Sequence, residues 1–187
     1  NGEQEIMLFS DAGKVARFKE TDLRVLSRQA SGVRGIRLTA IGDDSEGEDD
    51  AGDDDVNDTP VNAKVIGLIV IGDGDVLTVS ERGYGKRTDV ADFPVRKRGG
   101  KGVIAQSLTD KTGALVSAIQ VQATDELMLI ADSGKLIRTR VSEVRVLGRN
   151  TQGVRLIRLE EGEALMGVDR IEAQGEDEAG TEPATEA

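Results

Sequence analysis

Apolar residues occur in short blocks separated by polar turns that contain glycine, and the same order of blocks recurs three times. Each copy begins with a continuous apolar run, at residues 6–9, 76–79 and 127–131. A run in which apolar and polar residues alternate follows the turn, as in residues 14–18. Continuous runs of this length are typical of strands buried on both faces, and alternation is typical of half-exposed strands. Because no run has a helical period, the pattern predicts an all-β fold.

Three segments of the chain align without gaps, at residues 5–38, 75–108 and 126–159. Two glycine columns recur in this alignment: Gly13, Gly83 and Gly134 form the first, and Gly32, Gly102 and Gly153 form the second. Glycine in the first column supplies the positive φ of a tight turn. An internal period near 50 residues with strand character predicts a propeller-like array.

Each repeat is expected to form a blade of four strands. The third strands are expected at residues 33–38, 103–108 and 154–159, and the fourth strands at residues 65–71, 115–121 and 165–171. The three blades then cover about residues 5–71, 72–121 and 122–171. Residues 1–171 therefore form one partial disc of three blades in this prediction.

Acidic residues are concentrated in two segments of the chain. Residues 43–58 hold ten Asp and Glu, and residues 172–187 hold six, with no Lys or Arg in either segment. Setting these sixteen carboxylates aside from the formal net charge of −11 leaves a charge of +5 on the other residues. Segments so poor in apolar residues are predicted to be disordered. A basic body with acidic appendages indicates a nucleic-acid partner.

The chain contains no cysteine and no histidine. This composition excludes disulfides, thiolate metal sites and the Cys or Ser-His nucleophiles of many enzymes. No catalytic residue, metal site or cofactor is predicted within these residues. No apolar run approaches the roughly 18–20 residues of a membrane span, and no signal peptide opens the chain. We therefore expect a cytoplasmic protein without a membrane partner.

Two glycine-rich basic runs, at residues 83–88 and 96–102, are the strongest candidates for a polyanion contact. Arginines also recur at equal positions in the three repeats, and such a ladder could follow the phosphates of DNA. Single cations on a surface can equally serve solubility, and residues 96–102 could be an ordinary flexible loop. The predicted DNA-binding residues are Arg17, Arg28, Arg34, Arg37, Lys86, Arg87, Arg96, Lys97, Arg98, Lys101, Arg138, Arg140, Arg149, Arg155 and Arg158.

The chain has only four aromatic residues, which is too few for a platform that stacks the bases of a single strand. Duplex DNA is therefore the expected ligand. Residues 83–88 lack the spacing of a phosphate-binding P-loop, and residues 43–58 lack the spacing of a calcium loop.

Residues 83–88, 31–38 and 143–153 and the acidic C-terminal segment make the chain resemble the C-terminal domain family of the bacterial gyrase A subunits, which are type IIA topoisomerases. Residues 96–102, Arg-Lys-Arg-Gly-Gly-Lys-Gly, match the signature Gln-Arg-Arg-Gly-Gly-Lys-Gly of that family except at the first two positions. The segment lies beside a motif typical of the fifth blade. The chain thus resembles the last three blades, and the acidic insert at residues 43–58 is a departure from the pattern.

The resemblance implies a β-pinwheel, in which neighbouring blades exchange strands and a basic rim wraps duplex DNA with positive handedness. It further implies a non-catalytic part of an ATP-dependent enzyme that introduces negative supercoils. ATP and Mg²⁺ would act in the holoenzyme, an A2B2 assembly on the bacterial nucleoid that also contains gyrase B and the rest of gyrase A. Two alternatives are the C-terminal domain of the decatenating topoisomerase IV, and a propeller that binds an acidic protein.

Overall fold

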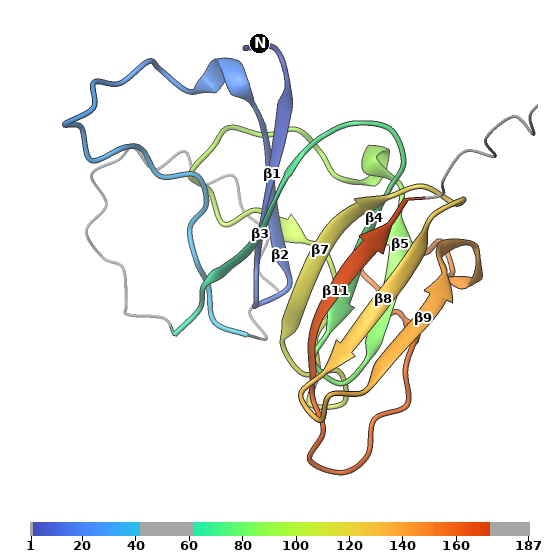
Figure 1. Cartoon of the computed structure of the whole chain (residues 1–187). Helices are drawn as coiled ribbons and strands as arrows, with labels where there is room; N and C mark the ends of the chain where they lie inside the picture. The colour runs from blue at the N-terminus through green and yellow to red at the C-terminus, as the bar shows by residue number, and fades with distance from the viewer. Residues whose placement is uncertain (1, 42–61, 173–187) are drawn as a thin grey trace, which may run out of the picture.

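The computed structural model describes residues 2–41 and 62–172 of the 187-residue chain. Eleven strands and three short 3-10 helices form in this part of the chain (Figure 1). The strands are β1 (Glu5–Ser10), β2 (Lys14–Lys19), β3 (Val65–Val70), β4 (Asp75–Ser80), β5 (Tyr84–Thr88), β6 (Val103–Ile104), β7 (Leu115–Val121), β8 (Glu126–Ala131), β9 (Leu136–Arg140), β10 (Val154–Arg155) and β11 (Leu165–Ile171). The 3-10 helices are η1 (Glu20–Asp22), η2 (Val90–Asp92) and η3 (Val141–Glu143). The predicted all-β fold is confirmed.

The strands form three antiparallel sheets, one for each repeat. Sheet 1 has the order β3-β1-β2-β6, sheet 2 the order β10-β5-β4-β7, and sheet 3 the order β11-β8-β9. Each sheet is built on a hairpin whose turn contains a glycine of the first column, and the φ values of Gly13, Gly83 and Gly134 lie between 76° and 82°. The turn predicted from these glycines is therefore present in every repeat.

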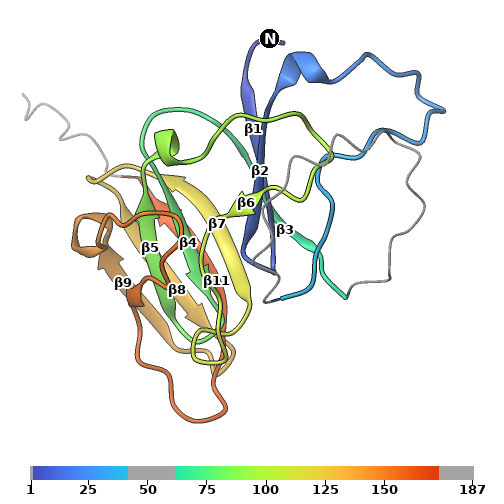
Figure 2. The same ribbon diagram turned by 180° about the vertical axis from the view of Figure 1, so that it is seen from behind.

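The fourth strand of a sheet comes from the next repeat along the chain. β6 of the second repeat pairs with β2 (Figure 2). β10 of the third repeat pairs with β5. The exchange of strands between neighbouring blades, which the resemblance implies, is therefore present, whereas the prediction that each blade is built from a single repeat is wrong. The donated strands β6 and β10 are only two residues long, and the chain bends directly after β6 and soon after β10.

Residues 33–38, the expected third strand of the first repeat, form no strand. By analogy with β6 and β10 this segment would pair with a sheet preceding sheet 1, and the described residues contain no such sheet. Ile36 instead packs on Ala16 and Phe18 of β2, with Leu38 beside them. The segment is thus held by these apolar contacts and by backbone hydrogen bonds to the second repeat at Gly35 and Arg37, and not by strand pairing.

The three sheets stack face to face, and two apolar clusters lie between them. The cluster between sheets 1 and 2 is centred on Met7, Phe9 and Val76. The cluster between sheets 2 and 3 includes Leu77 and Leu129. Sheet 2 lies in the middle, so β4 is buried on both faces from its second residue onward, as its continuous apolar run predicts.

The predictions for the acidic insert at residues 43–58 and for nearly all of the acidic tail at residues 172–187 fall outside the described residues. Within the described ranges, no helix has the length and apolar character that crossing a membrane requires.

Candidate nucleic-acid interface

The loops that follow the 3-10 helices of the three repeats lie side by side. Backbone amides of the first and second repeats are joined by hydrogen bonds from Gly99 to the Gly35 carbonyl (2.8 Å) and from Arg37 to the Gly100 carbonyl (2.9 Å). The amide of Ser107 donates to the carbonyl of Thr151 (3.1 Å), which joins the second repeat to the third. We call the surface formed by residues 23–37, 93–107 and 144–158 the loop band. It is continuous across all three repeats.

Most of the predicted DNA-binding residues lie in the loop band. Its exposed cations from the predicted set are Arg28, Lys97, Arg155 and Arg158, and the half-buried ones are Arg34, Arg37, Arg96, Arg98, Lys101 and Arg149. The sequence reasoning did not select Arg24 and Arg145, which lie in the same loops and are also exposed. Arg140 is exposed at the end of β9, outside the loop band.

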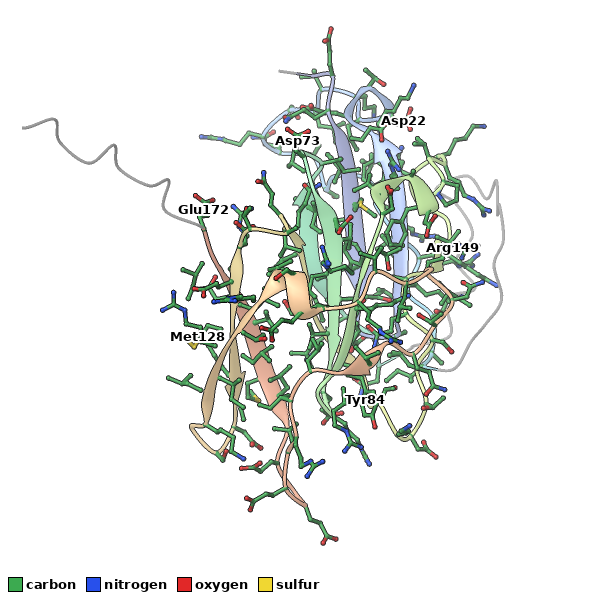
Figure 3. All side chains as sticks on the ribbon, turned by 90° about the vertical axis from the view of Figure 1, so that its right-hand side faces the viewer. Asp22, Asp73, Tyr84, Met128, Arg149 and Glu172 are labelled. Atoms are coloured by element: carbon green, nitrogen blue, oxygen red, sulfur yellow. The ribbon has the colours of Figure 1, made fainter. Side chains whose placement is uncertain are left out.

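Arg98 and Arg149, which share one column of the alignment, connect neighbouring loops. The Arg98 guanidinium donates to the carbonyl oxygens of Arg34 (3.0 Å) and Asp22 (3.3 Å). Arg149 donates to the carbonyl of Ile104 (3.4 Å) in the preceding repeat and lies on the loop side of the molecule (Figure 3). Arg28, the third member of the column, is exposed. These arginines thus carry charge into the loop band and also hold it together.

Arg17 and Arg87 lie between the sheets and not on the rim. Arg17 donates to the carboxylate of Glu5 (2.8 Å) and to the carbonyls of Val90 (2.6 Å) and Phe93 (2.8 Å) in the next repeat. Arg87 likewise bonds Asp75 (3.1 Å) and the Val144 carbonyl (2.9 Å). We call Arg17 and Arg87 the latch arginines, because each ties its own hairpin to the following repeat.

Arg138 occupies the same column in the third repeat, where its side chain is 60% exposed. It pairs with Glu126, the equivalent of Glu5 and Asp75, and no following sheet covers it within the described residues. The acidic partner of the latch was missed by sequence reasoning. A signal was present, because each aligned segment opens with an acidic residue twelve positions before the arginine.

Lys86 is buried, although the sequence placed it among the DNA contacts. Its ammonium group donates to the carbonyls of Gly148 (2.6 Å) and Arg149 (2.5 Å). Burial lowers the pKa of Lys86 to about 7; the carboxylate of Asp92 opposes this shift, and the Arg149 guanidinium adds to it. Lys86 therefore fixes the third loop to sheet 2 from inside the protein.

Tyr84 lies in a small cationic cluster at the edge of sheet 2. Its hydroxyl oxygen accepts a hydrogen bond from Arg155 (2.8 Å), and this bond lowers the pKa of the phenol. The Lys111 ammonium lies 5.1 Å from the centre of the ring. The residue as a whole is only 7% exposed, so Tyr84 serves packing and orients Arg155 at the rim of the loop band.

The sequence matches the protein family described as DNA gyrase C-terminal domain, beta-propeller, over residues 4–43, 74–122 and 125–172. These three blocks follow the three repeats, and the acidic insert falls between the first and second blocks.

Curated relatives include the DNA gyrase A subunit of Salmonella typhimurium strain LT2, which is 46% identical over 179 residues. The DNA gyrase A subunit of Escherichia coli strain K12 is 46% identical over 172 residues, and that of Haemophilus influenzae is 43% identical over 194 residues. The alignments cover 95%, 91% and 100% of this chain but only 18%, 17% and 22% of the relatives. The chain thus spans less than a quarter of the length of these proteins.

Solved structures that share the fold include two C-terminal domains. The DNA gyrase A C-terminal domain aligns with a TM-score of 0.72 and 24% identity, covering 90% of this chain and 51% of that one. The C-terminal domain of DNA topoisomerase IV aligns with a TM-score of 0.73 and 18% identity, covering 91% and 47%. The two backbones are equally similar to this chain, so the sequence match decides the assignment. The chain belongs to the family of DNA gyrase C-terminal β-propeller domains.

Proposed function

We propose that this chain binds duplex DNA along the loop band and wraps it with positive handedness, as the non-catalytic C-terminal domain of a gyrase A subunit. The observation that carries the proposal is the continuity of the loop band, which places cations of three repeats on one surface. Each cation that neutralises a phosphate releases counterions and adds affinity without reading sequence. The ligand is therefore duplex DNA of any sequence.

The aromatic residues support a duplex over a single strand. Phe9, Phe18, Phe93 and Tyr84 are all the aromatic residues of the chain, and each is at most 7% exposed. Binding of single strands relies on exposed aromatic rings that stack on bases. Phosphate contacts are the recognition chemistry that this surface offers.

Wrapping requires contacts spread over a curved and stable surface. Bending 20–30 bp by 40–90° costs on the order of 1–6 kcal/mol, so several phosphates must be bound along the path. The stacked sheets and their latch arginines hold the three loops at fixed positions, which satisfies this requirement.

The proposed role in the cell is support of ATP-dependent negative supercoiling in the bacterial cytoplasm, on the nucleoid. Strand passage, ATP and Mg²⁺ belong in this proposal to gyrase B and to the rest of gyrase A, in an A2B2 holoenzyme. The residues of this chain contribute the path that the DNA follows. No catalytic step is assigned to them.

Exposed cations from the three repeats provide the binding test. The triple variant Arg28→Ala, Lys97→Ala, Arg158→Ala is expected to weaken duplex binding and to reduce the slope of log K against log salt by about 0.9 for each phosphate that is no longer neutralised. Fluorescence anisotropy with a labelled duplex at several salt concentrations measures both. The matched control Arg28→Lys, Lys97→Arg, Arg158→Lys keeps the charges and should keep the slope. An unchanged slope in the alanine variant would reject these positions as phosphate contacts.

A topology assay separates wrapping from simple binding. Nicked circular DNA sealed by ligase in the presence of the chain should retain positive supercoils after the protein is removed, and the triple alanine variant should leave fewer. Binding without a change in linking number would favour the weakly wrapping alternative, the topoisomerase IV domain. A propeller that binds an acidic protein would keep its partner when duplex DNA is added in excess.

A further inference from the structure

Two positively charged side chains converge on Tyr84, at the point where the third repeat donates a strand to sheet 2. Arg155 of β10 pairs with Tyr84 of β5, and its guanidinium donates a hydrogen bond of 2.8 Å to the hydroxyl oxygen. Lys111, in the loop between β6 and β7, places its ammonium group 5.1 Å from the centre of the ring. We call Tyr84, Lys111 and Arg155 the Tyr84 cluster. It connects the loop band to a loop outside it.

The two cations of the cluster act on the same phenol. The hydrogen bond from Arg155 lowers the pKa of Tyr84 most, and the charges of Arg155 and Lys111 lower it further, while burial opposes them. Within residues 2–41 and 62–172, neither cation has a carboxylate at ion-pair distance. The repulsion between the two charges is therefore not offset by an acidic side chain, and a bound anion would offset it.

The hydrogen-bonding groups that the cluster leaves available are donors. The Tyr84 hydroxyl accepts from Arg155, and its own hydrogen is donated to no group in the described part of the chain. The guanidinium and the ammonium have only donors. Arg82 is exposed and lines the same hollow, where it adds a further guanidinium. Such groups match the oxygens of a phosphate, which accept hydrogen bonds and carry negative charge.

The packing of the sheets does not account for the cluster. Contacts that hold the sheets together occur at both junctions between repeats, as the latch arginines do. At the junction of the first and second repeats, the positions of Arg155 and Tyr84 are taken by Ile104 and Lys14, which pair in the same way. The described residues thus contain this cluster once, and the sheets stack at the other junction without it.

The cluster borders an open hollow of about 630 Å³ whose walls all belong to the second and third repeats. Glu81, Glu160, Glu161 and Glu163 lie in these walls as well. The Glu163 carboxylate is occupied, because it accepts from the Glu160 amide (2.8 Å) and pairs with Lys135 (3.3 Å). The other three carboxylates repel a free anion. The hollow therefore favours a phosphate that is held in place by the rest of its molecule.

We propose that the Tyr84 cluster binds one backbone phosphate of duplex DNA. Arg155 belongs to the loop band and Lys111 does not, so the cluster extends the path of the DNA from the loop band across the edge of sheet 2. The phosphate accepts hydrogen bonds from Arg155, Lys111 and the Tyr84 hydroxyl, and the duplex bound to the loop band brings it into the hollow. The source of the phosphate rests on the proposed function, whereas the chemistry of the site does not.

Tyr84 itself reports on the site, because the chain contains one tyrosine and no tryptophan. A bound phosphate opposes the negative charge of the phenolate, so it should raise the pKa of Tyr84. The absorbance of the phenolate, followed against pH, measures this pKa as inorganic phosphate replaces chloride at constant ionic strength. The pKa is expected to rise with phosphate and to reach a plateau.

Variants of the two cations show whether the response comes from the cluster. Lys111→Met and Arg155→Met each remove one exposed cation, so each should raise the pKa of Tyr84 in chloride and abolish the further rise with phosphate. Lys111→Arg keeps the charge and should keep the rise. Lys64→Met is the matched control, because Lys64 is exposed next to β3, at the edge of sheet 1 opposite to β6. It should behave like the unchanged chain.

A duplex titration identifies the source of the phosphate. Lys111→Met should reduce the slope of log K against log salt by about 0.9, which corresponds to one phosphate contact. Fluorescence anisotropy with a labelled duplex at several salt concentrations measures the slope. Lys111→Arg and Lys64→Met should keep the slope of the unchanged chain.

The two measurements fail independently. A pKa of Tyr84 that does not respond to phosphate overturns the site, even where the duplex binds to the loop band. A rise with phosphate together with an unchanged salt slope in Lys111→Met overturns DNA as the source and leaves a site for free phosphates. An unchanged chain that binds no duplex overturns the proposed function and DNA as the source, and the phosphate titration then decides separately whether the site exists.

Discussion

Lys86 is a buried amine whose described hydrogen bonds go to backbone carbonyls of the next repeat. Those carbonyls favour the ammonium form, but burial favours the neutral amine more strongly, and the pKa falls to about 7. Below pH 7 the folded and unfolded states are both protonated, so the full cost of burying the charge is present. Between pH 7 and the unfolded value of 10.5 the native state loses its proton first.

The free energy of unfolding should therefore rise with pH from about 7 to 10 in the unchanged chain, and Lys86→Met should reduce that rise. Urea unfolding at several pH values measures the difference. The exposed Lys97→Met is the matched control and should keep the dependence of the unchanged chain. Parallel curves for the unchanged chain and Lys86→Met would contradict the coupling.

Recurrence in the sequence identified important residues but did not separate their roles. The glycine columns could be predicted, because a tight turn allows few other residues. The arginine column of Arg17, Arg87 and Arg138 was interpreted as a DNA ladder, yet two of its members are latch arginines. In a repeat protein, contacts between repeats recur as regularly as contacts with a repeating ligand. Only burial distinguishes the two, and burial depends on the stacking of the sheets.

At the scale of elements, each latch arginine joins a strand of one sheet to the next repeat, at its 3-10 helix or the residue directly after it. Arg87 is 11% exposed and Arg138 is 60% exposed, although both pair with the acidic residue that opens their hairpin. The chain thus allows a comparison between Arg87, which also contacts the next repeat, and Arg138, which pairs with Glu126 of its own hairpin.

Arg87→Ala is expected to lower the free energy of unfolding by about 2–3 kcal/mol, because it leaves Asp75 and the Val144 carbonyl without their partner. Arg138→Ala should cost less than about 1 kcal/mol, as exposed ion pairs contribute little. Chemical denaturation of both variants provides the comparison. Equal losses would show that the carbonyl contacts do not stabilise the stack.

Strand positions were predicted well for the hairpins and for the fourth strands β3, β7 and β11, and poorly for the exchanged strands. β1, β2, β4 and β5 follow from the apolar pattern around the glycine turns. The pattern carries no information on which sheet receives β6 or β10, because two paired residues are too short to show a period. Residues 33–38 have the same pattern and form no strand, since strand formation there requires a receiving sheet.

At the scale of the whole molecule, charge is divided between the body and the acidic segments. Residues 43–58 and 172–187 carry sixteen carboxylates and no cation, and the other residues have a net charge of +5. Acidic segments attached to a basic surface compete with DNA for its cations at low ionic strength.

Deletion of residues 43–58 should therefore tighten duplex binding at low salt, and the gain should disappear as salt rises and screens the charges. Anisotropy titrations at low and high salt measure the effect. A chain of full length with Asn and Gln in place of the ten carboxylates should behave like the deletion, since charge and not length is the cause. Equal affinity of the deleted and unchanged chains at low salt would contradict competition between residues 43–58 and DNA.

Strand exchange also sets the order in which the protein can mature on the ribosome. Sheet 2 begins at Asp75, but its last strand ends at Arg155, inside the third repeat. The nascent chain consequently carries an incomplete sheet, with the edge of β5 open, until the third repeat has left the exit tunnel. Translation must therefore run well past a blade before that blade reaches its native form.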